Sequence, residues 1–193
     1  MIKKLILLVL PLLSLTSVSD GQAKTSIENH FKNDVAYYLD HFEDYQYSNW
    51  DFRYGDMINN YAMTYFAPSK GFFGTEAYNE LCIDYVHTGA NDLPIIVWKA
   101  PFSGKVSFDI SAKLKYYNEQ NQDGTAVVIY NNNKEEVYFQ ILDYTKVDEV
   151  YKYEDSFNIK KGEKIYFTVD LIGNNYFDNT DIDINIYLTD LTK

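Results

Sequence analysis

The chain has 193 residues, and its 28 acidic side chains outnumber its 17 basic ones, which gives a formal net charge of −11. A charge of this sign disfavours binding to nucleic acid and to anionic membrane surfaces. Cys82 is the only cysteine, so no disulfide forms within the chain and the fold must depend on an apolar core. The 19 tyrosines, 12 phenylalanines and only 4 prolines favour β-structure.

The N-terminus has the pattern of a targeting segment. Two lysines precede the apolar run "LILLVLPLLSLTSV", which is too short for a membrane span and is soon followed by polar residues. Gly21 and Ala23 suggest cleavage after Ala23, with Ser17 and Ser19 marking a second option. We therefore expect a Sec-type signal peptide over residues 1–23, no membrane span after its removal, and a protein that is secreted, periplasmic or at the cell surface.

The segment that follows is the one candidate for a helix. Thr25 or Ser26 is placed to cap its start, and the apolar residues of 24–45 recur near helical spacing. These residues are Ile27, Phe31, Val35, Tyr38, Leu39 and Phe42. We expect a short N-terminal helical extension over residues 24–44, followed by the main domain over residues 45–193.

Beyond the helix the apolar period changes to two, which is typical of half-buried strands. The first such strand, within "GKVSFDISAKL", points Val106, Phe108, Ile110, Ala112 and Leu114 to one face. Residues 125–142 contain two strand-like runs around "NNNKE" and predict a hairpin.

The C-terminal part continues the same alternation. Residues 165–171 point Ile165, Phe167, Val169 and Leu171 inward, with Tyr166, Thr168 and Asp170 outward. Residues 181–188 point Ile182, Ile184, Ile186 and Leu188 inward, with Asp181, Asp183, Asn185 and Tyr187 outward. Short strands at about ten-residue spacing without intervening helices predict an all-β fold, an antiparallel β-sandwich.

The ordered motifs between residues 45 and 188 resemble a non-catalytic β-sandwich module that is appended to secreted bacterial glycoside hydrolases and polysaccharide lyases. The matching stretches are "SNWDFRYGDM" (48–57), "LPIIVWKAPFSGKVSF" (93–108), "QDGTAVVIYNNN" (122–133) and "KGEKIYFTVDLIGNNYFDNTDIDINI" (161–186). The resemblance implies a jelly-roll-like sandwich and a role in attachment to substrate rather than in chemistry.

The chain departs from that module at two places. The family has a His before its Pro, where this chain has Leu93 before Pro94. The family closes with Trp-Asp-Pro, where this chain has Ile182, Asp183 and Ile184. If relatives contact their ligand at these positions, the resemblance implies a weaker or different ligand here.

The sequence lacks the patterns that catalysis requires. His30, His41 and His87 show no His-x-x-x-His spacing, and neither a Gly-x-Ser-x-Gly turn nor a phosphate-binding glycine loop is present. Cys82 lies within "LCIDYV", where a small buried side chain is the simpler interpretation. We therefore expect no catalytic residues and no enzyme activity.

Sugar binding requires an aromatic ring that stacks on a pyranose and polar groups that bind its hydroxyls. The segment around Trp50 offers both, so we expect Tyr47, Trp50, Asp51, Arg53 and Tyr54 to contact ligand. The alternative is that Trp50 packs in the core, as a strand tryptophan more often does.

The loop "GNNYFDNTDID" is rich in oxygen ligands of the kind that Ca²⁺ takes. Its candidate ligands for a structural Ca²⁺ are Asn174, Asp178, Asp181 and Asp183. The alternative is a turn held by local side-chain hydrogen bonds.

Taken together, these patterns predict a secreted, acidic, non-catalytic binding module whose partner is carbohydrate. The alternative function is a structural or protein-interaction β-sandwich of the cell envelope or of a secreted assembly, with residues 24–45 as a docking helix.

Overall fold

The computed structural model describes residues 26–40, 42–115, 123–147, 149–176 and 178–192. The predicted signal peptide over residues 1–23 and its cleavage sites lie outside the described residues, as does His41. Among the described residues, no helix is long and apolar enough to cross a membrane.

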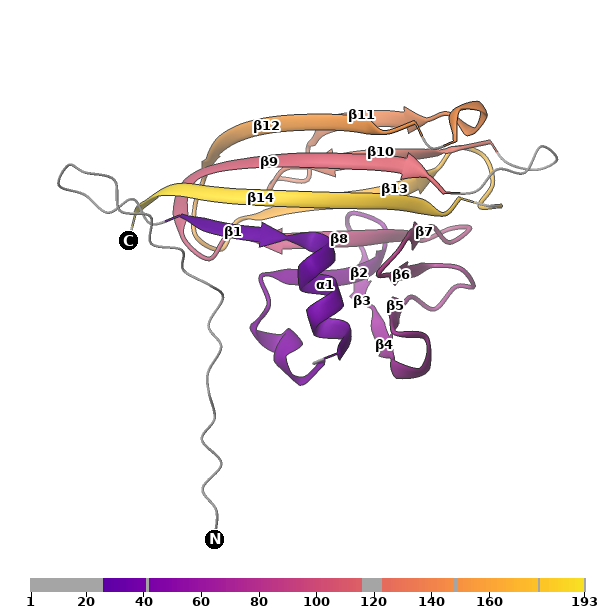
Figure 1. Ribbon diagram of the computed structural model, residues 1–193, viewed down its shortest axis with the longest axis horizontal. Helices are drawn as coiled ribbons and strands as arrows, with labels where there is room; N and C mark the ends of the chain where they lie inside the picture. Colours follow the sequence, from indigo (N-terminus) through magenta and orange to yellow (C-terminus); the bar gives the residue numbers. More distant parts are fainter. Residues whose placement is uncertain (1–25, 41, 116–122, 148, 177, 193) are drawn as a thin grey trace, which may run out of the picture.

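Two antiparallel sheets form the layers of a β-sandwich (Figure 1). The first, sheet A, runs in the order β12 (Tyr151–Ile159), β9 (Ser103–Leu114), β14 (Thr180–Thr192), β7 (Val86–His87), β6 (Glu80–Cys82), β5 (Gly71–Phe73) and β4 (Thr64–Phe66). The strand β1 (Ile27–His30) also pairs with β14. The second, sheet B, runs β11 (Glu136–Leu142), β10 (Thr125–Tyr130), β13 (Lys164–Leu171), β8 (Leu93–Lys99), β2 (Trp50–Gly55) and β3 (Asn60–Ala62). The predicted all-β sandwich is confirmed.

In the part of the chain that the structure describes, helical structure is confined to short segments. One α-helix, α1 (Phe31–Asp40), follows β1 and is followed by the 3₁₀ turn η1 (Phe42–Tyr47). Two further 3₁₀ turns, η2 (Ala67–Ser69) and η3 (Tyr144–Lys146), connect strands.

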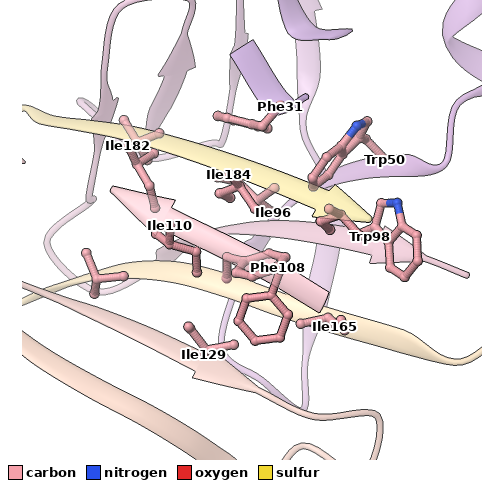
Figure 2. Close-up of a cluster of buried hydrophobic side chains, with 14 of the residues drawn as sticks. Phe31, Trp50, Ile96, Trp98, Phe108, Ile110, Ile129, Ile165, Ile182 and Ile184 are labelled. Atoms are coloured by element: carbon pink, nitrogen blue, oxygen red, sulfur yellow. The ribbon is translucent and has the colours of Figure 1, made fainter. Parts of the chain in front are cut away.

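The core lies between the inner faces of the two sheets, as Figure 2 shows for side chains such as Ile110, Ile129 and Ile184. Phe108 of β9 meets Phe167 of β13 edge to face, with ring centroids 6.1 Å apart, which joins the two layers. The predicted inward residues of β9 and β14 are buried, and residues 125–142 form the predicted hairpin. Period-two patterning was therefore sufficient to assign the inner faces of these long strands.

The helix begins at Phe31 rather than at Thr25 or Ser26. Residues Ile27–His30 are extended because they pair with one edge of β14, in the register Ile27 to Leu188 and His30 to Asn185. Pairing satisfies backbone groups that an open sheet edge would leave to solvent. Within α1, Phe31 and Val35 are buried, so both elements pack on the sandwich.

The strand β13 differs from its predicted pattern of one wet face. Tyr166 is only 8% exposed and Thr168 is fully buried, although both point away from the inner core. They lie on the outer face of sheet B, where Ile95 and Val97 of the neighbouring β8 are also buried. This strand is covered on both sides, so its polar outward residues did not mark a solvated surface.

Candidate functional site

The outer face of sheet A carries a row of polar side chains that crosses four adjacent strands. Strand pairing places Glu154 of β12 opposite Asp109 of β9, Asp109 opposite Asn185 of β14, and Asn185 opposite His30 of β1. We call these four residues the polar row. Because neighbouring strands lie about 4.8 Å apart, the row presents hydrogen-bonding groups at a regular spacing.

Hydrogen bonds fix the orientation of the middle of the row. The amide Nδ2 of Asn185 donates to Oδ1 of Asp109 at 2.8 Å. The amide oxygen of Asn185 therefore faces His30, whose Nδ1 lies 2.6 Å away and must act as the donor. The Nε2 of His30 lies 3.8 Å from Oε2 of Glu28.

A shallow hollow of about 550 Å³ opens beside the polar row. It is lined by Ser107, Phe108, Asp109, Glu154, Asp155, Ser156 and Tyr187. Tyr187 is partly exposed, and its ring meets the ring of His30 edge to face at 6.2 Å. Burial and the nearby carboxylate of Asp109 raise the pKa of Tyr187, so its hydroxyl stays protonated and can donate.

This arrangement suits a ligand that is rich in hydroxyl groups. Carboxylates accept hydrogen bonds from hydroxyls, and serine and tyrosine hydroxyls can both donate and accept. An aromatic ring at the edge of such a surface offers apolar contact to the C–H face of a sugar ring. We call the hollow together with the polar row the polar face.

The predicted ligand residue Trp50 does not present a ring face to solvent. It is 3% exposed and packs edge to face on Phe31, with ring centroids 5.4 Å apart (Figure 2). Its Nε1 is also occupied, because it donates to Oδ2 of Asp34 at 2.7 Å. Trp50 is therefore a core residue, which corrects its assignment as a stacking platform.

Tyr54 and Tyr47 are the other aromatic residues of that predicted site. Tyr54 is half-buried against the core and lies 5.7 Å from the ring of Tyr61. Tyr47 ends η1, and its side chain lies outside the part of the chain that the structure describes. Neither residue belongs to the polar face.

Asp51 and Arg53 lie together on the outer face of sheet B. Arg53 donates from NH1 to Oδ2 of Asp51 at 3.0 Å and from Nε to Oδ1 of Asn60 at 2.5 Å. Its NH2 donates to the backbone oxygen of Asn60 at 3.0 Å. The guanidinium is thus committed to internal partners that hold β3 against β2.

The four predicted metal ligands do not converge. Asp181 pairs with Nζ of Lys32, and Asp183 faces outward on β14, whereas Asp178 is fully buried. Asn174 bonds to a residue that the prediction did not include, Asp123. Within the described ranges, no group of three or more His, Cys, Asp or Glu side chains is placed to hold a metal ion.

The described histidines and the cysteine are engaged separately. His87 is 5% exposed, and its Nδ1 lies 2.8 Å from the backbone oxygen of Thr88. Burial raises the pKa of the Cys82 thiol, which disfavours the nucleophilic thiolate. His30 lies on β1 and belongs to the polar row.

Sequence reasoning placed Asn185 and Tyr187 on the outward face of their strand, and the alternation around Phe108 and Ile110 puts Asp109 outward as well, but these residues were not combined into one site. Alternation assigns a face to each residue, whereas the pairing of β9 with β14 and of β14 with β1 decides which residues are neighbours. The one feature of the sequence that pointed to this site was the recurrence of polar outward residues on both β9 and β14.

No protein-family model matches this sequence, and no curated protein matches it. Among solved structures, it aligns with the CBM51-2 and INT domains of Clostridium perfringens ZmpB at 12% identity and a TM-score of 0.40, over 72% of this chain and 26% of that one. The same domains in complex with GlcNAc align at 13% identity and a TM-score of 0.38, over 72% and 25%. A family 35 carbohydrate binding module from Clostridium thermocellum aligns at 16% identity and a TM-score of 0.34, over 60% and 85%. The chain thus spans about a quarter of the ZmpB structures, and at these TM-scores the likeness carries no functional argument.

Proposed function

We propose that this protein is a secreted, non-catalytic binding module that attaches to carbohydrate through the polar face. The observation that carries the proposal is the hollow of about 550 Å³ beside a cross-strand row of hydrogen-bonded polar side chains. Sugar hydroxyls would bind to Asp109, Glu154 and the flanking serines, and one sugar ring would lie against Tyr187.

Rigid placement of these groups favours recognition of a flexible ligand. Asn185 is held between Asp109 and His30, so it does not have to be ordered when the ligand binds. The side chains stand on long strands of sheet A rather than on loops, which lowers the entropy cost of binding. Such a surface suits a glycan chain that lies across the strands.

The charge of the polar face indicates which glycans it binds. Asp109 and Glu154 supply two carboxylates to the hollow, and no basic side chain lines it. Asp155 also lines the hollow, but its carboxylate accepts a hydrogen bond from the hydroxyl of Tyr153. Acidic polysaccharides would be repelled, whereas neutral hydroxyls donate to carboxylates. We therefore propose neutral glycans as the substrate class.

The carboxylates of the hollow raise the question of whether the protein could hydrolyse a bound glycan. Asp109 and Glu154 stand at paired positions, as two carboxyls of a glycosidase could. Here they line an open hollow, and Glu154 is exposed, so water has free access to both. We expect bound glycan to be released unhydrolysed, and analysis of the recovered glycan by mass spectrometry checks this.

A glycan array with the purified protein tests the proposal. We expect a coherent set of related neutral glycans to bind. Tyr187→Ala should weaken binding at least tenfold with an unchanged melting temperature, because Tyr187 is partly exposed. The matched control is Tyr61→Ala, which removes a tyrosine that is 61% exposed on sheet B.

Two outcomes would contradict the proposal. The first is a folded protein that binds no glycan on the array. The second is glycan binding that Tyr187→Ala leaves unchanged, which would exclude the polar face as the site.

A second candidate function is protein interaction, and one surface favours it. The strand β11 is the outermost strand in the order of sheet B and exposes Val137, Phe139 and Ile141 on one face, at 39%, 50% and 46%. A row of this kind on an outer strand is a typical contact surface for another protein. If the array is blank, loss of partner capture in Phe139→Ser would favour this alternative.

A further inference from the structure

Two buried carboxyl groups lack the partners that burial normally requires. Asp178 is 0% exposed, and neither of its carboxyl oxygens has a hydrogen-bond partner. The Oδ1 of Asp123 is likewise buried without a partner. An uncompensated buried carboxylate is costly, so native proteins pair such groups or bind a metal ion with them.

The fold brings these two aspartates close enough for their charges to interact. Asp123 lies two residues before β10, and Asp178 lies two residues before β14. The first residues of these strands, Thr125 and Thr180, are joined by a buried hydrogen bond of 3.0 Å between their hydroxyls. The two carboxyls therefore enter the same region from opposite sheets.

The loop before β14 is also tied to Asp123. The backbone N and the Nδ2 of Asn174 both donate to Oδ2 of Asp123 at 3.0 Å. This leaves Oδ1 of Asp123 directed elsewhere, as an unpartnered acceptor. Gly124 follows with φ +96, and a Cβ there would lie 2.4 Å from the backbone oxygen of Leu142, so the backbone is tightly packed around the aspartate.

We propose that Asp123 and Asp178 bind one calcium ion, which joins the loop before β14 to the start of β10. The available donors are the unpartnered carboxylate oxygens of these two residues, which hard divalent cations prefer. Ca²⁺ fits better than Mg²⁺, because it accepts an irregular shell completed by backbone oxygens and water.

The electrostatics of the pair agree with this site. Burial, together with the negative charge of Asp123, raises the pKa of Asp178 to about 8. Without a cation, the two carboxyls cannot both be charged near neutral pH without cost. A divalent cation between them would remove that cost and stabilise both carboxylates.

This site differs from the one that the loop sequence predicted and is independent of the proposed glycan site. It adds Asp123, which precedes a different strand, and it leaves out Asp181 and Asp183, which face outward. Asn185 of the polar row lies five residues further along β14 than Thr180, roughly 16 Å away along the strand.

Calorimetric titration and thermal unfolding of the purified full chain after treatment with EDTA test the proposal. We expect one Ca²⁺ to bind per chain. At a Ca²⁺ concentration about 100-fold above Kd, the melting temperature should rise by roughly 5–10 °C. Asp178→Asn and Asp123→Asn should each abolish this rise, whereas Asp183→Asn, a matched change on the exposed side of β14, should keep it.

Three results would overturn the proposal. One is a wild-type protein that unfolds cooperatively but neither binds Ca²⁺ nor shifts its melting temperature. Another is a Ca²⁺ response that both Asp178→Asn and Asp123→Asn retain. The third is a wild-type protein whose melting temperature does not respond to Ca²⁺, together with an Asp178→Asn variant that is more stable than the wild type. That result would mean that the two aspartates share a proton and bind no cation.

Discussion

The carboxylate of Asp34 accepts a hydrogen bond of 2.7 Å from the indole Nε1 of Trp50. The neighbouring Trp98, which pairs with Trp50 across β2 and β8, donates in the same way to Oδ1 of Asn29 at 3.1 Å. Both acceptors come from the segment of β1 and α1, so this N-terminal segment supplies polar partners to two core tryptophans. Buried indole N–H groups need such partners.

Removing the first acceptor should destabilise the protein. Asp34→Ala leaves the Nε1 of Trp50 buried without a partner, and we expect a loss of about 1.5–3 kcal/mol in the free energy of unfolding. Urea unfolding measures it. The exposed Asn33, one residue earlier on α1, provides the control, and Asn33→Ala should change stability by less than about 0.5 kcal/mol. Equal stability of the two variants would mean that the hydrogen bond contributes nothing.

The carboxyl group of Asp34 should also make the stability of the protein depend on pH. Burial raises the pKa of Asp34 above its usual 3.8, so the folded state holds this proton more tightly than the unfolded state does. Its contribution to stability is complete below pH 3.8 and is lost as the pH rises through the higher folded-state pKa. The stability of the wild type relative to Asp34→Asn should therefore fall as the pH rises above 3.8, by less than about 1.4 kcal/mol per pH unit. A constant or rising difference in urea unfolding across this range would contradict the assignment.

Substitution of Trp50 distinguishes a core residue from a ligand-binding residue. Because it is 3% exposed and packed on Phe31, Trp50→Ala should lower the free energy of unfolding by about 3–5 kcal/mol. Circular dichroism during urea unfolding measures the loss. A variant with unchanged stability and lost glycan binding would instead restore Trp50 as a ligand residue.

Placing a negative charge at Asn185 tests whether the hydrogen bonds of the polar row stabilise the sheet. Asn185→Asp replaces the donor that faces Asp109 with a second carboxylate, and like charges directly opposite one another destabilise a sheet. We expect a loss of up to about 1 kcal/mol at low ionic strength, because each cross-strand pair contributes about that much. Screening in 1 M NaCl should recover part of it. Urea unfolding at the two salt concentrations measures both, and a loss that salt does not change would point to packing instead.

Binding of a neutral glycan should depend weakly on salt. The proposed contacts are hydrogen bonds and apolar packing on Tyr187, which screening hardly affects. We expect the Kd for a glycan found on the array to change less than threefold between 50 mM and 500 mM NaCl. A steep dependence would indicate a cationic ligand attracted by Asp109, Glu154 and Asp155 instead.

Much of the fold follows from the sequence because a strand with one buried face must alternate. The inward residues of β9 and β14 are read from spacing alone, since a period of two assigns each side chain to a face. The same rule failed for Tyr166 and Thr168, because whether an outer face is wet depends on what covers it. The start of α1 was also missed, because Ile27–His30 pairs with a strand that lies about 155 residues away.

The sequence by itself determined the sandwich and which side chains of its long strands face inward. The tertiary structure alone decided which polar residues meet. Asp109, Asn185 and His30 become neighbours through strand register, and Asp123 and Asp178 through the approach of β10 and β14. The physical reason is that local periodicity fixes the direction of a side chain relative to its own strand, whereas a site depends on pairings between distant segments, which are set by the packing of the whole core.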